Sequence, residues 1–207
     1  MAAEDECVQW DYNAEHYANS VAICCAEFIE QIRKSPDSQA GALRDTRPFH
    51  KAIFRKAVPA ACLYLAGEYR GAEYGCLRHR EVALGARIGA PCCDVDRLMR
   101  DFHVSLRLSL LSLESSLCSS ERTPEFLHDV IVFIAQVVST FQDIHPYADG
   151  NGHVGRLLVW VITGHFGMTP AQWWLHKNPG TDWNQAVYAH QTGNPVPLQR
   201  FLMSTLF

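Results

Sequence analysis

Two long apolar stretches with helical periodicity, separated by a short polar segment, constrain the fold of this chain more than any other feature. The first starts at Thr123, a residue suited to a helix N-cap, and carries an apolar stripe over residues 126–141. The second starts near Asn151 and stops near Gly167. Helices of this apolar character are buried when they pack against other helices. The sequence therefore predicts a domain built by helix-on-helix packing.

Apolar residues at helical spacing predict five further helices. Their expected ranges are Tyr12–Arg33, Pro48–Tyr64, Asp94–Leu117, Trp183–Gln191 and Leu198–Thr205. A glycine-rich segment between the second and third of these contains a short alternating pattern, which predicts a small strand or hairpin. Its residues are Arg80, Glu81, Val82, Ala83 and Leu84. We expect an all-α fold with one small β-hairpin, in which residues 1–42 form an N-terminal helical segment and residues 43–207 the main body of a single compact domain.

The composition limits the classes of partner. The chain has 207 residues, of which 48% are hydrophobic and 19% charged, so it can build its own core. Its net charge is −4 and its Lys and Arg residues form no stripe, which argues against a nucleic-acid partner. No apolar run has the length of a membrane span, and the acidic residues near the N-terminus are unlike a secretory signal. We expect neither a nucleic-acid nor a membrane partner.

The eight cysteines include two adjacent pairs, Cys24–Cys25 and Cys92–Cys93, and no C-x-x-C motif. Because the chain is long enough to fold without cross-links, a disulfide scaffold is not expected, and the adjacent pairs suggest a reducing compartment. Cys76 and His79 have the spacing of zinc ligands, but the downstream pair lacks a normal spacer. We favour the interpretation of the cysteines as small, partly buried apolar residues.

The polar segment between the two most apolar helices, residues 145–156, carries the strongest indication of chemistry. Gly150 and Gly152 let backbone N–H groups approach a ligand closely, and the following helix adds the positive end of its dipole, which suits an anion. Asp149 is the only acid in the segment, and a single carboxylate beside phosphates is a common set of magnesium ligands. His145 can accept and return a proton near neutral pH.

Three further residues complete the candidate site. Asn151 could donate an amide hydrogen to a phosphate oxygen or hold the loop. His153 and Arg156 are three residues apart and can overlook the site from one helix face. A base, a metal ligand, an anion site and a cation together suit phosphoryl or nucleotidyl transfer. Each residue alone would be read as part of an ordinary turn or as a structural histidine, and only the joint arrangement favours chemistry.

The same segment resembles the signature of the Fic family, H-P-F-x-D/E-G-N-G-R-x-x-R. The residues that match in type and spacing are His145, Pro146, Asp149, Gly150, Asn151, Gly152 and Arg156. Tyr147 stands in the place of phenylalanine. Elsewhere, residues 65–70 resemble the A-G-x-x-R segment of the family, residues 75–93 its flap hairpin, and residues 188–201 its C-terminal end.

The resemblance implies a protein nucleotidyltransferase, an AMPylator, that moves AMP from ATP to a Tyr, Thr or Ser hydroxyl of a target protein and releases pyrophosphate. It implies that His145 deprotonates this hydroxyl and that Asp149 holds Mg²⁺ or Mn²⁺ against the ATP phosphates. The residues it implies for nucleotide and phosphate binding are Gly150, Asn151, Gly152, His153, Gly155 and Arg156. The flap over residues 80–84 would dock the target as an added strand. The expected location is the cytoplasm, or the host cytosol for a secreted effector.

One departure from the family pattern concerns the donor. His153 stands where the signature has its first arginine, and an imidazole is a weaker and mostly neutral phosphate ligand at pH 7. Nucleotide affinity could therefore fall, rise with acidity, or shift to another donor. The family includes members that transfer UMP, phosphocholine or phosphate. A nucleotide-binding regulatory module with little catalysis is the remaining alternative.

A second departure concerns inhibition. Many family members carry an inhibitory helix with the motif S/T-x-x-x-E-G/N, whose Glu pairs with the last arginine of the signature, and no such motif occurs in this sequence. Arg156 would then be opposed by a separate, antitoxin-like partner or by none. The segment Ala14–Lys34 is interpreted as a packing helix. Removal of AMP, the reverse reaction, relies on that Glu in the family and is not favoured.

Overall fold

The computed structural model describes residue 10 and residues 15–84, 87–116, 122–168, 173, 175, 176 and 178–206. Its α-helices are α1 (Glu15–Lys34), α2 (Pro36–Arg44), α3 (Arg47–Phe54), α4 (Val95–Ser116), α5 (Pro124–Ile144), α6 (Asn151–His165), α7 (Thr181–Gln191) and α8 (Val196–Leu206). Its 3₁₀ turns are η1 (Ala60–Leu65), η2 (Gly75–Leu77) and η3 (Cys92–Asp94). Its strands, β1 (Ala83–Leu84) and β2 (Arg87–Ile88), pair in antiparallel fashion. The predicted all-α fold with a small β-hairpin is confirmed.

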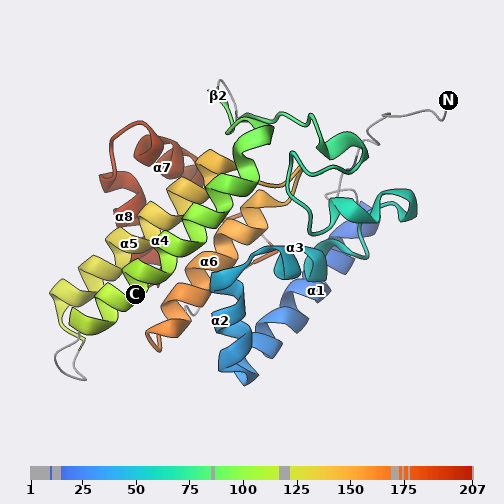
Figure 1. Ribbon diagram of the computed structural model, residues 1–207. Helices are drawn as coiled ribbons and strands as arrows, with labels where there is room; N and C mark the ends of the chain where they lie inside the picture. The colour runs from blue at the N-terminus through green and yellow to red at the C-terminus, as the bar shows by residue number, and fades with distance from the viewer. Residues whose placement is uncertain are drawn as a thin grey trace.

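Helix α5 forms the centre of the helical body. It packs against α6 and is flanked by α4, α7 and α8 (Figure 1). The helix begins where the sequence predicts, because the Thr123 hydroxyl oxygen accepts a hydrogen bond from the Phe126 N–H at 3.2 Å. Val130, Ile134 and Val138 of α5 are fully buried. Burying these two apolar helices side by side fixes the ends of the loop that joins them.

Helix α5 is also the one helix in the described residues that is long and apolar enough to cross a membrane. Half of its most apolar window is buried inside the domain, and four helices pack around it. The hydrophobic core therefore accounts for its apolar character.

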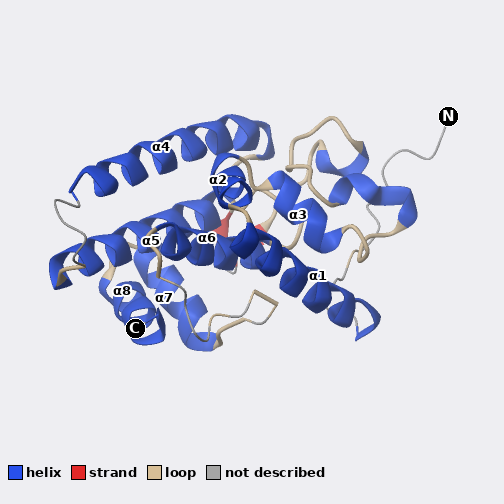
Figure 2. Cartoon of the chain, turned by 90° about the horizontal axis from the view of Figure 1, so that it is seen from below, coloured by secondary structure: helices blue, strands red, loops and turns tan. Residues whose placement is uncertain are grey.

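The N-terminal helices lie on the other side of α6. Helix α1 packs against α2 and α3, and α2 is seen end-on between α4 and α6 in Figure 2. This arrangement brings α3, and the segment of short turns after it, to the N-terminal end of α6. The division of the chain at residue 42 stays a prediction.

Two helix predictions were wrong, and both errors involve proline. Pro36 was expected only to end the helix predicted over Tyr12–Arg33, but it also opens α2, because proline is tolerated in the first turn of a helix. The single helix expected over Pro48–Tyr64 is divided: α3 ends at Phe54, and η1 begins after Pro59. Residues 12–14 lie outside the described residues, and the other predicted helices have ends shifted by one or two residues.

The strand expected over Arg80–Leu84 is shorter than predicted. Only Ala83–Leu84 forms a strand, and one more hydrogen bond joins the Gly89 N–H to the Val82 carbonyl at 3.0 Å. The backbone carbonyl of Arg80 accepts a hydrogen bond from the guanidinium of Arg70 instead of pairing with a strand. The polar groups at the start of the predicted strand are thus used for a different contact.

The cysteines that the structure describes do not form a metal site. Cys24, Cys25 and Cys62 are buried. The Cys76 sulfur lies 3.8 Å from a tyrosine hydroxyl, and the Cys92 sulfur donates to a backbone carbonyl at 3.5 Å. Over the described ranges, no three His, Cys, Asp or Glu side chains gather as a metal centre requires, so the zinc interpretation has no support.

Candidate functional site

The loop between α5 and α6 brings the C-terminal end of one helix to the N-terminal end of the next. His145 is the C-cap of α5 and adopts the left-handed conformation, with φ 50° and ψ 61°. Its N–H donates to the Phe141 carbonyl at 2.9 Å. Gly150, with φ 80°, is the N-cap of α6, and no side chain caps that helix. An N-terminus without a side-chain cap can bind an anion with its first N–H groups.

The His145 side chain is a neutral imidazole at pH 7. Burial lowers its pKa to about 4, and the positive charge of Arg70 acts in the same direction. The backbone of Gln142 acts in the opposite direction. The ring can therefore accept a proton from a bound hydroxyl group.

Arg70 was not assigned a role from the sequence, although it ends the segment that resembles A-G-x-x-R. Its side chain is fully buried. The guanidinium donates to the His145 carbonyl at 2.8 Å and to the Ile144 carbonyl at 3.0 Å. On its other side it donates to the carbonyls of Arg80 and Ala90, each at 2.9 Å. One buried cation therefore joins the loop between α5 and α6 to the segments on both sides of the hairpin.

His50 is a second residue whose role the sequence did not reveal. Its Nδ1 accepts a hydrogen bond from the Gly67 N–H at 3.0 Å, so its Nε2–H donates to the Asp149 carbonyl at 2.9 Å. Its ring stacks on Tyr147, with ring centroids 3.8 Å apart and planes 7° apart. Burial lowers the pKa of His50 to about 3, so this arrangement holds in the neutral form. A histidine within the apolar stripe of α3 was the signal that could have revealed it.

Gly150→Ala is expected to lower the free energy of unfolding by about 2–5 kcal/mol. The left-handed backbone costs a residue with a Cβ roughly 1–2 kcal/mol, and overpacking adds about 1–3 kcal/mol. The overpacking arises because the new Cβ would lie 2.4 Å from a ring carbon of Phe54 and 2.8 Å from Nε2 of His50. Urea unfolding measures the loss. Gly193→Ala is the matched control, because Gly193 also has a positive φ, +94°, but nothing lies within 4 Å of its added Cβ. Equal losses in the two variants would contradict the packing argument.

Two side chains predicted to bind ligands are also part of the loop's own structure. Asp149 Oδ1 accepts a hydrogen bond from the Gly150 N–H at 2.8 Å, which orients the carboxylate. Asn151 accepts from the Tyr147 N–H and donates to the Tyr147 carbonyl, both at 2.9 Å. Through these two bonds the Asn151 side chain holds the loop, which is one of the two roles considered for it. Its role toward phosphate stays a prediction.

The two residues expected on one face of α6 are both buried. Arg156 donates from Nε and Nη2 to the Leu175 carbonyl, at 2.9 and 2.7 Å. Its Nη1 lies 3.2 Å from where a Cβ on Gly152 would stand, so the guanidinium lies beside the loop. His153 contacts the Phe54 ring edge-on, and its pKa is lowered to about 3, first by burial and then by the charge of Arg156. The alternative that His153 gains charge on mild acidification is therefore not supported.

The remaining predicted residue of the phosphate set, Gly155, lies at the contact between α5 and α6. An added Cβ would be 2.7 Å from the amide nitrogen of Gln142. The absence of a side chain at Gly155 therefore leaves room for the Gln142 amide, which donates to the Asn151 carbonyl at 3.3 Å. The role of Gly155 toward nucleotide stays a prediction.

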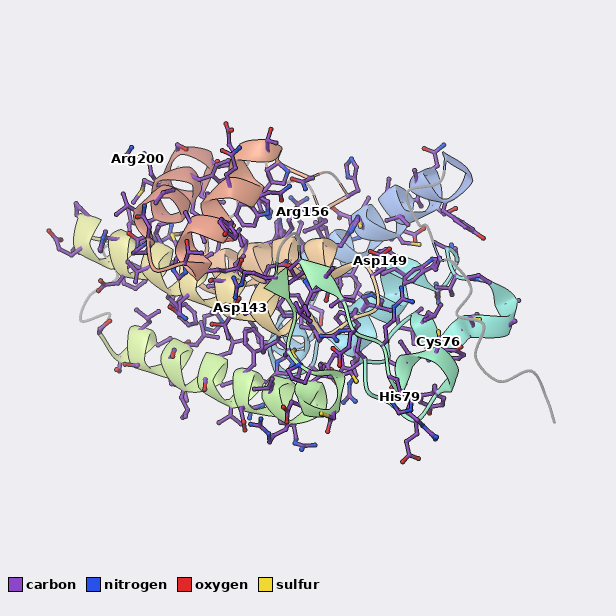
Figure 3. All side chains as sticks on the ribbon, turned by 90° about the horizontal axis from the view of Figure 1, so that it is seen from above. Cys76, His79, Asp143, Asp149, Arg156 and Arg200 are labelled. Atoms are coloured by element: carbon purple, nitrogen blue, oxygen red, sulfur yellow. The ribbon has the colours of Figure 1, made fainter. Side chains whose placement is uncertain are left out.

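The hairpin lies directly beside His145. An added Cβ on Gly89 would be 3.3 Å from the Cβ of His145, and the Ala90 N–H donates to the Asp143 carbonyl at 3.2 Å. Arg87 of β2 pairs with the Asp143 carboxylate at 2.8 Å. Figure 3 shows Asp143, Asp149 and Arg156 around the two strands, whereas Arg200 lies far from them on α8. The predicted flap is thus placed over the candidate catalytic residue.

Comparison with known families gives one finding. The family model described as Fic/DOC family matches residues 29–163, which is more than half of the chain. The matched range includes α5, the loop and nearly all of α6, together with α2, α3, α4 and the hairpin. None of the curated proteins compared with the chain matches it.

Proposed function

Since the chain belongs to the Fic/DOC family, whose members are generally transferases, we propose that it is a protein adenylyltransferase that moves AMP from ATP to a hydroxyl group of a target protein. The observation that carries the proposal is the neutral imidazole of His145 at the end of α5, next to the start of α6 at Gly150. A base and an anion site are thereby held on one short loop.

In the proposed reaction, the hydroxyl oxygen of a target Tyr, Thr or Ser forms a bond to the α-phosphorus of ATP. The bond between this phosphorus and the oxygen that bridges to the β-phosphate breaks, and pyrophosphate leaves with that bonding pair. The proton of the hydroxyl group passes to the imidazole of His145. N–H groups at the start of α6, near Gly152, stabilise the charge on the phosphate oxygens.

Asp149 is the residue that would hold Mg²⁺ or Mn²⁺. Its carboxylate is oriented by the Gly150 N–H and lies on the loop that carries His145. Magnesium in phosphoryl-transfer sites is commonly bound by one or two carboxylates together with the substrate phosphates, so this single acid fits the ion. Neutralising phosphate charge is the chemistry that such an ion supplies.

The buried, neutral His153 favours a second candidate, the same transfer with another donor. A guanidinium at that position would bring a permanent charge to the phosphates, and the imidazole, whose pKa is lowered to about 3, is neutral at pH 7. The donors of this second candidate are another nucleotide, a phosphocholine donor or a phosphate donor. Those that carry fewer charges than a nucleoside triphosphate would lose less from this change. We propose that the target docks on the flap by strand addition. A separate antitoxin-like protein is the proposed source of inhibition.

Labelling a cell lysate separately with each of four α-³²P nucleoside triphosphates tests the proposal. With Mg²⁺ present, we expect a labelled protein band with ATP that is absent when Mg²⁺ is removed. A band with a different nucleotide would support the second candidate. No band with any of them, in lysates from several cell types, would contradict nucleotidyl transfer and favour a nucleotide-binding module.

The rate of transfer is expected to depend on pH through His145. Its pKa is lowered to about 4, and the neutral form is the base, so kcat/KM should stay level from pH 8 to pH 5.5 and fall as the pH approaches 4. An initial-rate assay over this range measures the profile, with circular dichroism at each pH as the control for unfolding. A midpoint near the ordinary histidine value of about 6.5 would contradict the buried environment.

A further inference from the structure

A polar pocket lies apart from the loop, where the corner between α2 and α3 meets α4. Its volume is about 240 Å³. Four arginines line it: Arg44, Arg47, Arg100 and Arg107. These guanidinium groups concentrate positive charge around one small cavity in a chain whose net charge is −4.

The charges in this arginine pocket do not balance. Arg47 donates to both carboxylate oxygens of Asp45, and Arg100 is paired with Asp96. The guanidinium groups of Arg44 and Arg107 have no hydrogen bond or ion pair with any residue that the structure describes. The pocket therefore has two guanidinium groups in excess over its carboxylates.

His103 adds a buried nitrogen to the same pocket. The residue is 6% exposed, and its Nδ1 lies 3.3 Å from the Leu43 carbonyl, to which it can donate a hydrogen bond. Within the described part of the chain, the buried Nε2 has no hydrogen-bond partner. A buried polar atom of this kind is destabilising unless something binds it. An anion is a suitable partner, because it favours the protonated ring, which donates from Nε2.

We propose that the arginine pocket binds a small anion carrying phosphate groups, held by Arg44, Arg107 and His103. A guanidinium group can donate two parallel hydrogen bonds to two oxygens of one phosphate. The volume of the pocket admits a phosphate or a diphosphate rather than a whole nucleotide. This site is separate from the proposed transferase site, and neither proposal depends on the other.

The pocket is nonetheless connected to the catalytic loop. Tyr69 lines the pocket, and its ring lies under the guanidinium of Arg47 at 5.1 Å. The Tyr69 hydroxyl lies 3.4 Å from the Thr46 hydroxyl, which lies 2.7 Å from the hydroxyl of Tyr147. An anion bound at the pocket would therefore lie at one end of a hydrogen-bonded chain that reaches the loop.

A nuclear magnetic resonance titration of the full chain tests the proposal at the site itself. Sodium pyrophosphate is the probe, with inorganic phosphate and sulfate in parallel, and the readout is the ¹⁵N resonance of the His103 imidazole, assigned with His103→Gln. We expect a saturable shift of this resonance with pyrophosphate. In the double variant Arg44→Gln, Arg107→Gln the affinity should fall about tenfold or more, because two charge-assisted contacts are lost.

The matched control is the double variant Lys34→Gln, Arg97→Gln. This variant also loses two positive charges, but from exposed positions outside the pocket. It should bind pyrophosphate as the unmodified chain does. An unmoved His103 resonance, or the same loss of affinity in both double variants, would overturn the proposal. A shift with sulfate equal to that with pyrophosphate would overturn the assignment to phosphate.

Discussion

His145→Asn is expected to reduce transfer of the labelled nucleotide to protein by about 10²–10⁴-fold, the usual contribution of a general base. Asparagine cannot accept the proton of the target hydroxyl near neutral pH. It does tolerate the left-handed backbone that His145 adopts, with φ 50° and ψ 61°, so the turn between α5 and α6 should be kept. The initial rate of labelling measures the effect.

The control for this experiment is His128→Asn, because His128 is exposed on α5 and lies outside the loop. It should transfer label at the unmodified rate. The melting temperature of His145→Asn should lie close to that of the unmodified chain. A folded His145→Asn protein that labels its target at the normal rate would remove His145 from the role of base.

Arg70→Met is expected to lower the free energy of unfolding by about 3–5 kcal/mol, because several buried carbonyls each lose a hydrogen bond from a charged group, at about 1–3 kcal/mol apiece. The substitution keeps much of the side-chain volume and removes every donor. It leaves the carbonyls of Ile144, His145 and Ala90 without the hydrogen bonds that Arg70 now supplies. Urea unfolding followed by circular dichroism measures the loss.

The matched control is Arg97→Met on α4. Arg97 is exposed and paired with Asp94 and Asp101, and such surface pairs contribute about 0–1 kcal/mol. Arg70→Lys keeps the positive charge but loses the planar set of guanidinium N–H donors. Its loss of free energy of unfolding should therefore fall between those of Arg70→Met and Arg97→Met. Similar losses for Arg70→Met and Arg97→Met would show that the buried contacts of Arg70 contribute little.

The parts of the fold predicted correctly from the sequence are those set by neighbouring residues. Thr123 marked the start of α5 because its hydroxyl caps the helix locally. The loop from His145 to Arg156 was identified because its chemical groups lie close together in the chain. The same local rule failed at Pro36, which follows the end of α1 and opens α2, and near Pro59, which precedes η1 after α3 has already ended at Phe54.

The rest of the candidate site depends on contacts between distant segments, which no local pattern contains. His50 holds the Asp149 carbonyl from 99 positions away, and Arg70 holds the His145 carbonyl from 75 positions away. The bond from Arg156 to the Leu175 carbonyl is of the same kind. A sequence shows which residue types are available, but the partner of a buried cation or imidazole is decided by packing.

These same long-range hydrogen bonds set the order in which the site can form during folding. The apolar helices α5 and α6 are neighbours in the chain and can associate early, since closing a short loop costs little entropy. The loop between them acquires its bonds to His50 and Arg70 only after α3 and the hairpin segment have docked from far away in the sequence. After dilution from denaturant, helical signal should therefore return before the ability to transfer a nucleotide.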